Sequence, residues 1–109
     1  MLQQLFGNKT AERVLLYIAN YGHGYARDIA PTYETTLSMV QKQLTRLEAA
    51  AILVSRLVGK TRVYEINPRW YFHKELLALL QKALAALPPD ELKKYYRKRQ
   101  RPRRAGKPV

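Results

Sequence analysis

The apolar positions of residues 35–67 change their period once, and the two periods predict two kinds of element. In the second half, two short segments rich in β-branched and aromatic residues, 52–58 and 62–66, flank a Gly-Lys pair. That pattern predicts a β-hairpin with a tight turn. In the first half, spacings of three and four residues place the apolar side chains on one stripe of an α-helix: Leu37, Val40, Leu44, Leu47 and Ala51.

The face of this helix opposite the stripe is small, polar and basic, without the Glu/Lys pairs of an ordinary solvated helix. Such a face can lie close against another surface, and an α-helix fits the major groove of DNA, which is about 12 Å wide. Gln pairs with adenine, and Lys or Arg with guanine. The candidate DNA contacts are Thr36, Ser38, Gln41, Lys42, Thr45 and Arg46.

The predicted hairpin carries its basic residues near the tip, at Arg56, Lys60 and Arg62, and each can neutralise a phosphate. Charged hairpin tips are common, so this feature alone says little. A helix with a polar, basic outer face followed directly by a basic-tipped hairpin is, however, the layout of a winged helix-turn-helix. The alternatives are a plain amphipathic helix in an unrelated α-domain and a winged helix that binds protein rather than DNA.

Three segments carry a resemblance to a known family. The segment TTLSMVQKQLTRLEAAAILV resembles the recognition helix and first wing strand of ArsR-like winged-helix transcriptional regulators, and VGKTRVYEIN is similar to their wing. The segment LFGNKTAERVLLYIANYG resembles the opening helix of the same family. The resemblance covers residues 2–67 and implies a mainly α fold with a small β-hairpin wing (α+β). Ala51 stands where such proteins often carry glycine, so the helix exit is expected to differ here.

The remaining elements follow from periodicity and from helix-breaking residues. Gly7 and Asn8 separate a short lead-in from the first long helix, and Pro31 is expected to end the short helix before the turn. Thr35 or Thr36 is the predicted N-cap of the recognition helix. The helices expected outside the recognition helix cover residues 1–5, 10–20, 25–30, 69–87 and 90–98.

The chain is expected to divide into a winged helix-turn-helix domain (1–68), a C-terminal helical extension (69–96) and a basic tail (97–109) that is disordered alone. The apolar stripe of the extension is wider than one small core needs. It therefore predicts a two-fold dimer interface, made by Leu76, Leu77, Leu80, Leu84 and Leu87.

The net charge of +12 is concentrated at the C-terminal end. Residues 93–109 carry nine Lys or Arg and no acid, whereas residues 1–92 carry eleven bases and eight acids. A strongly basic protein attracts polyanions, most often nucleic acid. The alternative is a solubilising tail that touches no partner.

Little in the sequence supports other chemistry. There is no cysteine, which excludes disulfides and thiolate metal sites, and His23 and His73 have no metal-ligand partner three or four residues away. The acids are scattered, so no catalytic set, metal site or cofactor site is expected. The aromatic group at 70–72 is expected to pack the last helix onto the domain; the alternative is one wall of an effector pocket at a dimer interface.

These observations together predict a function. We expect a homodimeric, cytoplasmic, sequence-specific double-stranded DNA-binding regulator, a repressor rather than an enzyme, with no membrane association. The alternative is a winged-helix module that binds protein or RNA within a larger assembly.

Overall fold

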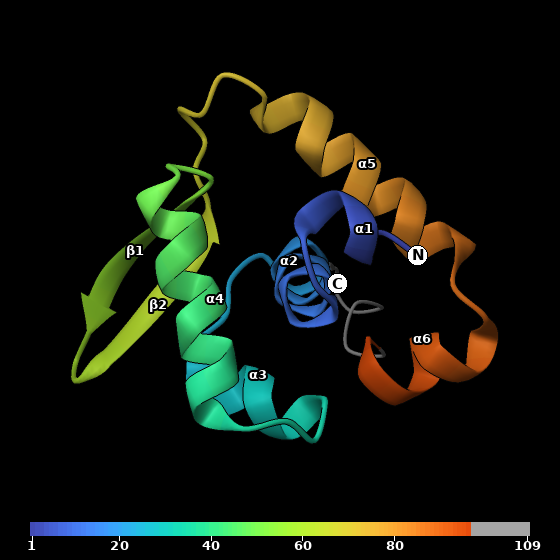
Figure 1. Ribbon diagram of the computed structural model, residues 1–109, viewed down its shortest axis with the longest axis horizontal. Coiled ribbons are helices and arrows are strands. Elements are labelled where there is room, and N and C mark those ends of the chain that lie inside the picture. Colours follow the sequence, from blue (N-terminus) through green and yellow to red (C-terminus); the bar gives the residue numbers. More distant parts are fainter. Residues whose placement is uncertain (97–109) are drawn as a thin grey trace, which may run out of the picture.

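The computed structural model describes residues 1–96, and the predicted tail, 97–109, lies outside the described residues. The fold is mainly helical with a two-strand hairpin (Figure 1), which confirms the predicted fold class. The elements are α1 (Gln3–Phe6), α2 (Lys9–Tyr21), α3 (Ala26–Thr32), α4 (Leu37–Ala49), β1 (Leu53–Val58), β2 (Thr61–Ile66), α5 (His73–Ala86) and α6 (Pro89–Tyr95).

Helix α2 is the centre around which the other elements pack. In Figure 1 it is seen nearly end-on, with α4 and the hairpin on one side and α5 and α6 on the other. Leu15 and Ile18 of α2, Leu44 of α4, and Leu80 and Leu84 of α5 are at most 1% exposed and belong to one core. Burial of each such side chain stabilises the fold by roughly 1.5–3 kcal/mol.

Side-chain caps begin helices α2 and α4, and of the two residues predicted to cap the recognition helix it is Thr36 that does so. The side chain of Asn8 accepts a hydrogen bond from the backbone N–H of Ala11 at 2.8 Å, which begins α2. The Thr36 hydroxyl accepts one from the N–H of Met39 at 3.2 Å, which begins α4. Both side chains satisfy a helix N–H that has no partner within the helix.

The prediction that Pro31 ends the third helix is wrong, because α3 continues to Thr32 with Pro31 inside it. Pro31 lies in the last turn, so its missing N–H removes only the bond to the carbonyl of Arg27, an exposed residue. The N–H of Tyr33 still reaches the carbonyl of Ile29 at 3.4 Å and closes the helix.

The hairpin is joined to the helical body through Gly24. Its N–H donates to the carbonyl of Tyr64 at 2.9 Å, and the N–H of Tyr64 donates back at 2.8 Å. A Cβ on Gly24 would lie 3.0 Å from the Cδ1 atoms of both Ile29 and Tyr17. Only glycine therefore lets the chain pass so close to α2 and α3 while pairing with the hairpin.

The turn of the hairpin has Gly59 at φ +65°, and Lys60 follows at negative φ. A positive φ at only the first central residue is typical of a type II′ turn, which matches the twist of paired strands. The register places Leu53 opposite Ile66 and Val58 opposite Thr61. We call β1, this turn and β2 the wing.

The exit of α4 keeps the left-handed conformation even though alanine occupies it. Ala51 has φ +66°, its N–H donates to the carbonyl of Glu48 at 2.9 Å, and the N–H of Ile52 donates to Leu47 at 3.0 Å. These two bonds form a Schellman motif. The Asn67 amide also donates to the Ala51 carbonyl at 2.9 Å. The expected difference in helix exit is therefore not seen.

Ala51→Gly is expected to stabilise the protein by about 0.5–1 kcal/mol. A left-handed residue with a Cβ costs roughly 1–2 kcal/mol, and glycine gives back part of that gain through its larger unfolded-state entropy. Ala49→Gly is the matched control, because Ala49 lies within α4 and should lose about 0.5–1 kcal/mol. Urea denaturation measures both. Destabilisation by Ala51→Gly would contradict the left-handed assignment.

Helix α5 is shorter than predicted, and its apolar stripe is used within the protomer. Leu76, Leu80 and Leu84 are 8%, 0% and 0% exposed, and α5 packs directly on α2. Leu77 and Leu87 are partly buried against the same core. The prediction that Leu76, Leu80 and Leu84 form a dimer interface is therefore corrected, because these side chains are buried in the core of the protomer, where α5 packs on α2.

Candidate nucleic-acid interface

The outer face of α4 is open to solvent. Ser38, Gln41, Lys42 and Thr45 are all exposed there, as the helical periodicity predicted. Thr36 is also exposed, although its hydroxyl caps the helix and lies 3.4 Å from the hydroxyl of Ser38. The side chains predicted to meet base edges therefore form one accessible surface.

A groove of about 500 Å³ separates α4 from the wing. Gln41 and Thr45 line it from α4, and Lys60 and Arg62 line it from the wing. Polar side chains suited to base edges thus lie beside cations suited to phosphates. This juxtaposition of helix and wing is the feature on which a nucleic-acid interface depends.

A chain of hydrogen bonds ties the wing to α4. The Arg62 guanidinium donates to the Ser55 hydroxyl at 3.0 Å, and this hydroxyl donates to the Glu48 carboxylate at 2.6 Å. Glu48 belongs to α4, Ser55 to β1 and Arg62 to β2. These two bonds connect the Arg62 side chain, through Ser55, to α4.

The third predicted wing contact, Arg56, lies on the other face. It is opposite Val63, whereas Arg62 is opposite Leu57, and neighbouring positions on a strand face opposite sides. Arg56 forms an ion pair with Glu65 at 2.7 Å. The pair is exposed, so it contributes only about 0–1 kcal/mol. The predicted cluster at the tip is therefore divided between the two faces.

Arg46 also differs from the predicted role. Its Nη2 donates to the carbonyl of Phe6 at 3.0 Å, and its Nε donates to the Gln43 side chain at 3.0 Å. The guanidinium thus satisfies a carbonyl at the C-terminal end of α1, where a cation is favourable. Arg46 links α4 to α1 and is turned away from the residues that line the groove.

Three residues of α3 and its N-cap also line the groove, and none of them was identified from the sequence: Tyr25, Ala26 and Arg27. Arg27 is exposed and adds a third cation, and Tyr25 forms part of the wall. Only the positive charge of Arg27 could have signalled this, because seven residues are too few to define a helical face. Tyr64 also lines the groove; burial raises the pKa of its hydroxyl, and nearby Glu48 adds to this, so it remains a hydrogen-bond donor.

The aromatic group after the wing is only partly packed. Trp70 contacts the core, whereas Tyr71 is 87% and Phe72 52% exposed.

Within residues 1–96 no three His, Cys, Asp or Glu side chains gather closely enough to hold a metal ion. No helix in that range is long and apolar enough to span a membrane.

Comparison with solved structures shows that this fold is similar to known winged-helix structures. YusO from Bacillus subtilis has a TM-score of 0.58 and 19% identity, over 84% of this chain and 72% of that one. A mutant of S. aureus MepR bound to an oligodeoxyribonucleotide has a TM-score of 0.54 and 17% identity, over 85% and 75%. ZitR from Lactococcus lactis has a TM-score of 0.51 and 16% identity, over 77% and 64%.

These three proteins are of the MarR family, so the likeness confirms the winged-helix class and does not reach the ArsR-like subfamily. No family model matches the sequence, and comparison with curated proteins found no match. At such low identity the shared feature is the fold: a mainly helical winged helix like those of MarR-family regulators.

Proposed function

We propose that this protein is a sequence-specific double-stranded DNA-binding transcriptional regulator. The observation that carries the proposal is the groove, which combines Gln41 and Thr45 of α4 with Lys60 and Arg62 of the wing. In a helix-turn-helix protein the recognition helix reads base edges in the major groove, and basic side chains elsewhere hold the phosphate backbone. The MepR structure bound to an oligodeoxyribonucleotide shows that a protein of similar fold does bind DNA.

The finer parts of the proposal rest on the sequence. We infer a cytoplasmic, homodimeric repressor of ArsR-like type, acting without a cofactor or catalytic step. A symmetric dimer would present two recognition helices to an inverted repeat, with half-sites about 34–36 Å apart. Because the inner stripe of α5 is buried, such a dimer would have to use other surfaces.

Selection of binding sequences from a random duplex pool tests the main proposal. We expect an enriched motif, and a duplex carrying it should bind far more tightly than random DNA at physiological salt. An inverted repeat in the motif would support the dimer. Equal affinity for the selected and the random duplex would contradict a sequence-specific regulator.

One observation favours the alternative of an interaction module. Leu57 and Val58 of the wing are 61% and 53% exposed, and Val54 is 39% exposed. Val54 and Val58 lie on the same face of the hairpin, opposite to that of Leu57, and neighbouring exposed apolar side chains on one face are typical of protein contacts. If the selection enriches no motif, a winged helix that binds protein or RNA becomes the better interpretation.

Truncation after Tyr96 is expected to weaken binding to every duplex without changing the preferred site. Segment 97–109 carries seven Lys or Arg and no acid. A polycation contacts phosphates in any register, so it adds affinity and salt dependence rather than choice of sequence. Salt titrations of both chains on one duplex provide the measurement, and identical slopes would mean that the tail makes no phosphate contacts.

A further inference from the structure

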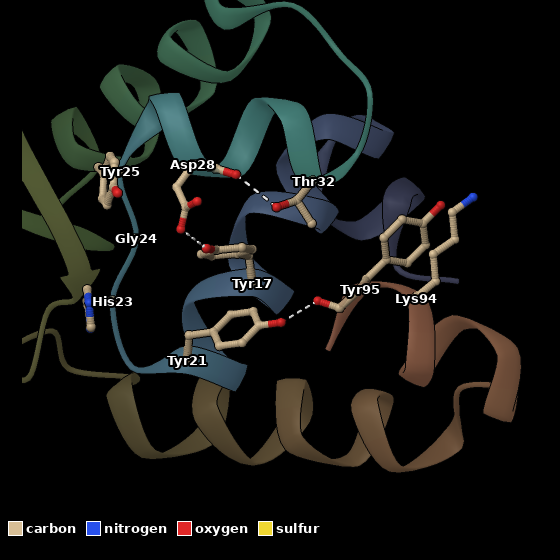
Figure 2. Close-up of a pocket in the computed structure, with 9 residues that line it drawn as sticks. All are labelled: Tyr17, Tyr21, His23, Gly24, Tyr25, Asp28, Thr32, Lys94 and Tyr95. Carbon is tan, nitrogen blue, oxygen red and sulfur yellow. Dashed lines mark hydrogen bonds between the residues drawn. The ribbon is translucent and has the colours of Figure 1, made fainter. Parts of the chain in front are cut away.

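A second hollow, of about 440 Å³, lies where α2, α3 and α6 meet (Figure 2). Its lining is unusually aromatic, and it contains a single carboxylate, Asp28. Figure 2 shows the Asp28 side chain reaching from α3 toward Tyr17 on α2. The tyrosines of the lining are Tyr17, Tyr21, Tyr25 and Tyr95.

The Asp28 carboxylate is held by a hydrogen bond but has no ion-pair partner among residues 1–96. One oxygen accepts a hydrogen bond from the Tyr17 hydroxyl at 2.5 Å, and Tyr17 is only 6% exposed. Burial raises the pKa of Tyr17, and its hydrogen bond to Asp28 adds to this, so the tyrosine remains the donor. Asp28 forms no ion pair within residues 1–96. The carboxylate of the lining therefore has the Tyr17 hydroxyl as a partner but no ion pair, and Lys94 of the same lining lies over the Tyr95 ring.

The tyrosine rings of the lining, like the Asp28 carboxylate, favour a positively charged ligand. A cation is attracted to the negative face of an aromatic ring within about 6 Å of its centre. The Lys94 ammonium already lies 5.3 Å from the ring centre of Tyr95, and the rings of Tyr17 and Tyr21 are 4.6 Å apart. An anion in the hollow would be repelled by the Asp28 carboxylate and would gain no such attraction from the tyrosine rings.

We propose that this hollow binds a planar organic cation of the amidinium or guanidinium type, stacked on tyrosine rings and paired with Asp28. Two sources present this chemistry. One is a free small molecule, and the other is an arginine of segment 97–109, which begins two residues after Tyr95.

Three probes of nearly equal shape test the sign of the site: benzamidine, benzamide and benzoate. Chemical-shift titration of the full chain, without DNA, should give benzamidine the highest affinity, at least about tenfold above benzoate. Asp28→Asn keeps an acceptor for Tyr17 and should weaken benzamidine about fivefold, with little change for benzamide. Asp90→Asn is the matched control, because Asp90 is exposed on α6 and outside the lining of the hollow.

Lys94→Gln separates a cation site from an anion site. Lys94 is the lysine of the lining, so its loss should leave benzamidine binding unchanged or tighter. A preference for benzoate that Lys94→Gln abolishes would overturn the proposal. So would the absence of benzamidine binding at millimolar concentration to a chain ending at Tyr96, which retains every side chain of the described core.

The source of the cation follows from the same titration. If an arginine of segment 97–109 is the occupant, benzamidine should bind the chain ending at Tyr96 more tightly than the full chain, because the competitor is gone. If the ligand is a free molecule, both chains should bind it equally. Either result supports the site, and neither depends on DNA binding.

Discussion

Replacing Leu80 with alanine is expected to lower the free energy of unfolding by about 2–5 kcal/mol. Leu80 is 0% exposed and lies in the core that α5 shares with α2. Its truncation removes buried apolar surface and leaves a cavity that close-packed neighbours fill only partly. Lys82→Ala is the matched control on the exposed face of the same helix and should change stability by at most about 0.5 kcal/mol.

Leu80→Glu distinguishes a protomer core from a dimer seam. A charge in a seam would give a folded monomer, whereas a charge in the core has no partner and should abolish cooperative unfolding. Circular dichroism during urea denaturation and sedimentation together separate the two outcomes. A Leu80→Glu chain that stays folded and only loses its partner would show that this leucine serves an interface after all.

Removing Arg62 or Lys60 is expected to weaken binding to all duplexes and to flatten its salt dependence. Each lost phosphate contact lowers the slope of log K against log salt by about 0.9. Both residues line the groove. Arg56→Ala is the matched control from the same hairpin, because Arg56 faces the other side and pairs with Glu65. Equal slopes for Arg56→Ala and Arg62→Ala would contradict the division of the wing into two faces.

Substitutions on the outer face of α4 should act differently from those in the wing. Lys42→Ala or Thr45→Ala is expected to relax base preference at one position, by roughly 1–3 kcal/mol for a lost bidentate pair. Affinity for random DNA should change much less. Competition between the selected duplex and single-base variants measures the preference, and equal losses on selected and random DNA would argue against base contacts.

Features that depend on near neighbours along the chain could be predicted from the residues alone. The spacing of Val40, Leu44 and Leu47 defines the buried stripe of α4, and all three are at most 3% exposed. Gly7 and Gly59 adopt positive φ at the breaks where they were expected. Such features follow from the periods of helices and strands and from the backbone conformations that glycine can adopt. They do not depend on how distant parts of the chain pack.

Which side chains remain accessible depends on how distant elements pack, and the residue pattern did not reveal it. Arg46 is occupied by Phe6, forty residues away, and Leu80 is covered by α2 from more than fifty positions earlier. The hydrogen bond from Tyr17 to Asp28, which holds the carboxylate at the hollow, joins two helices whose relative placement no local pattern encodes. Periodicity gives the direction of a side chain about its own helix or strand, whereas its partner depends on how elements far apart in the chain pack together.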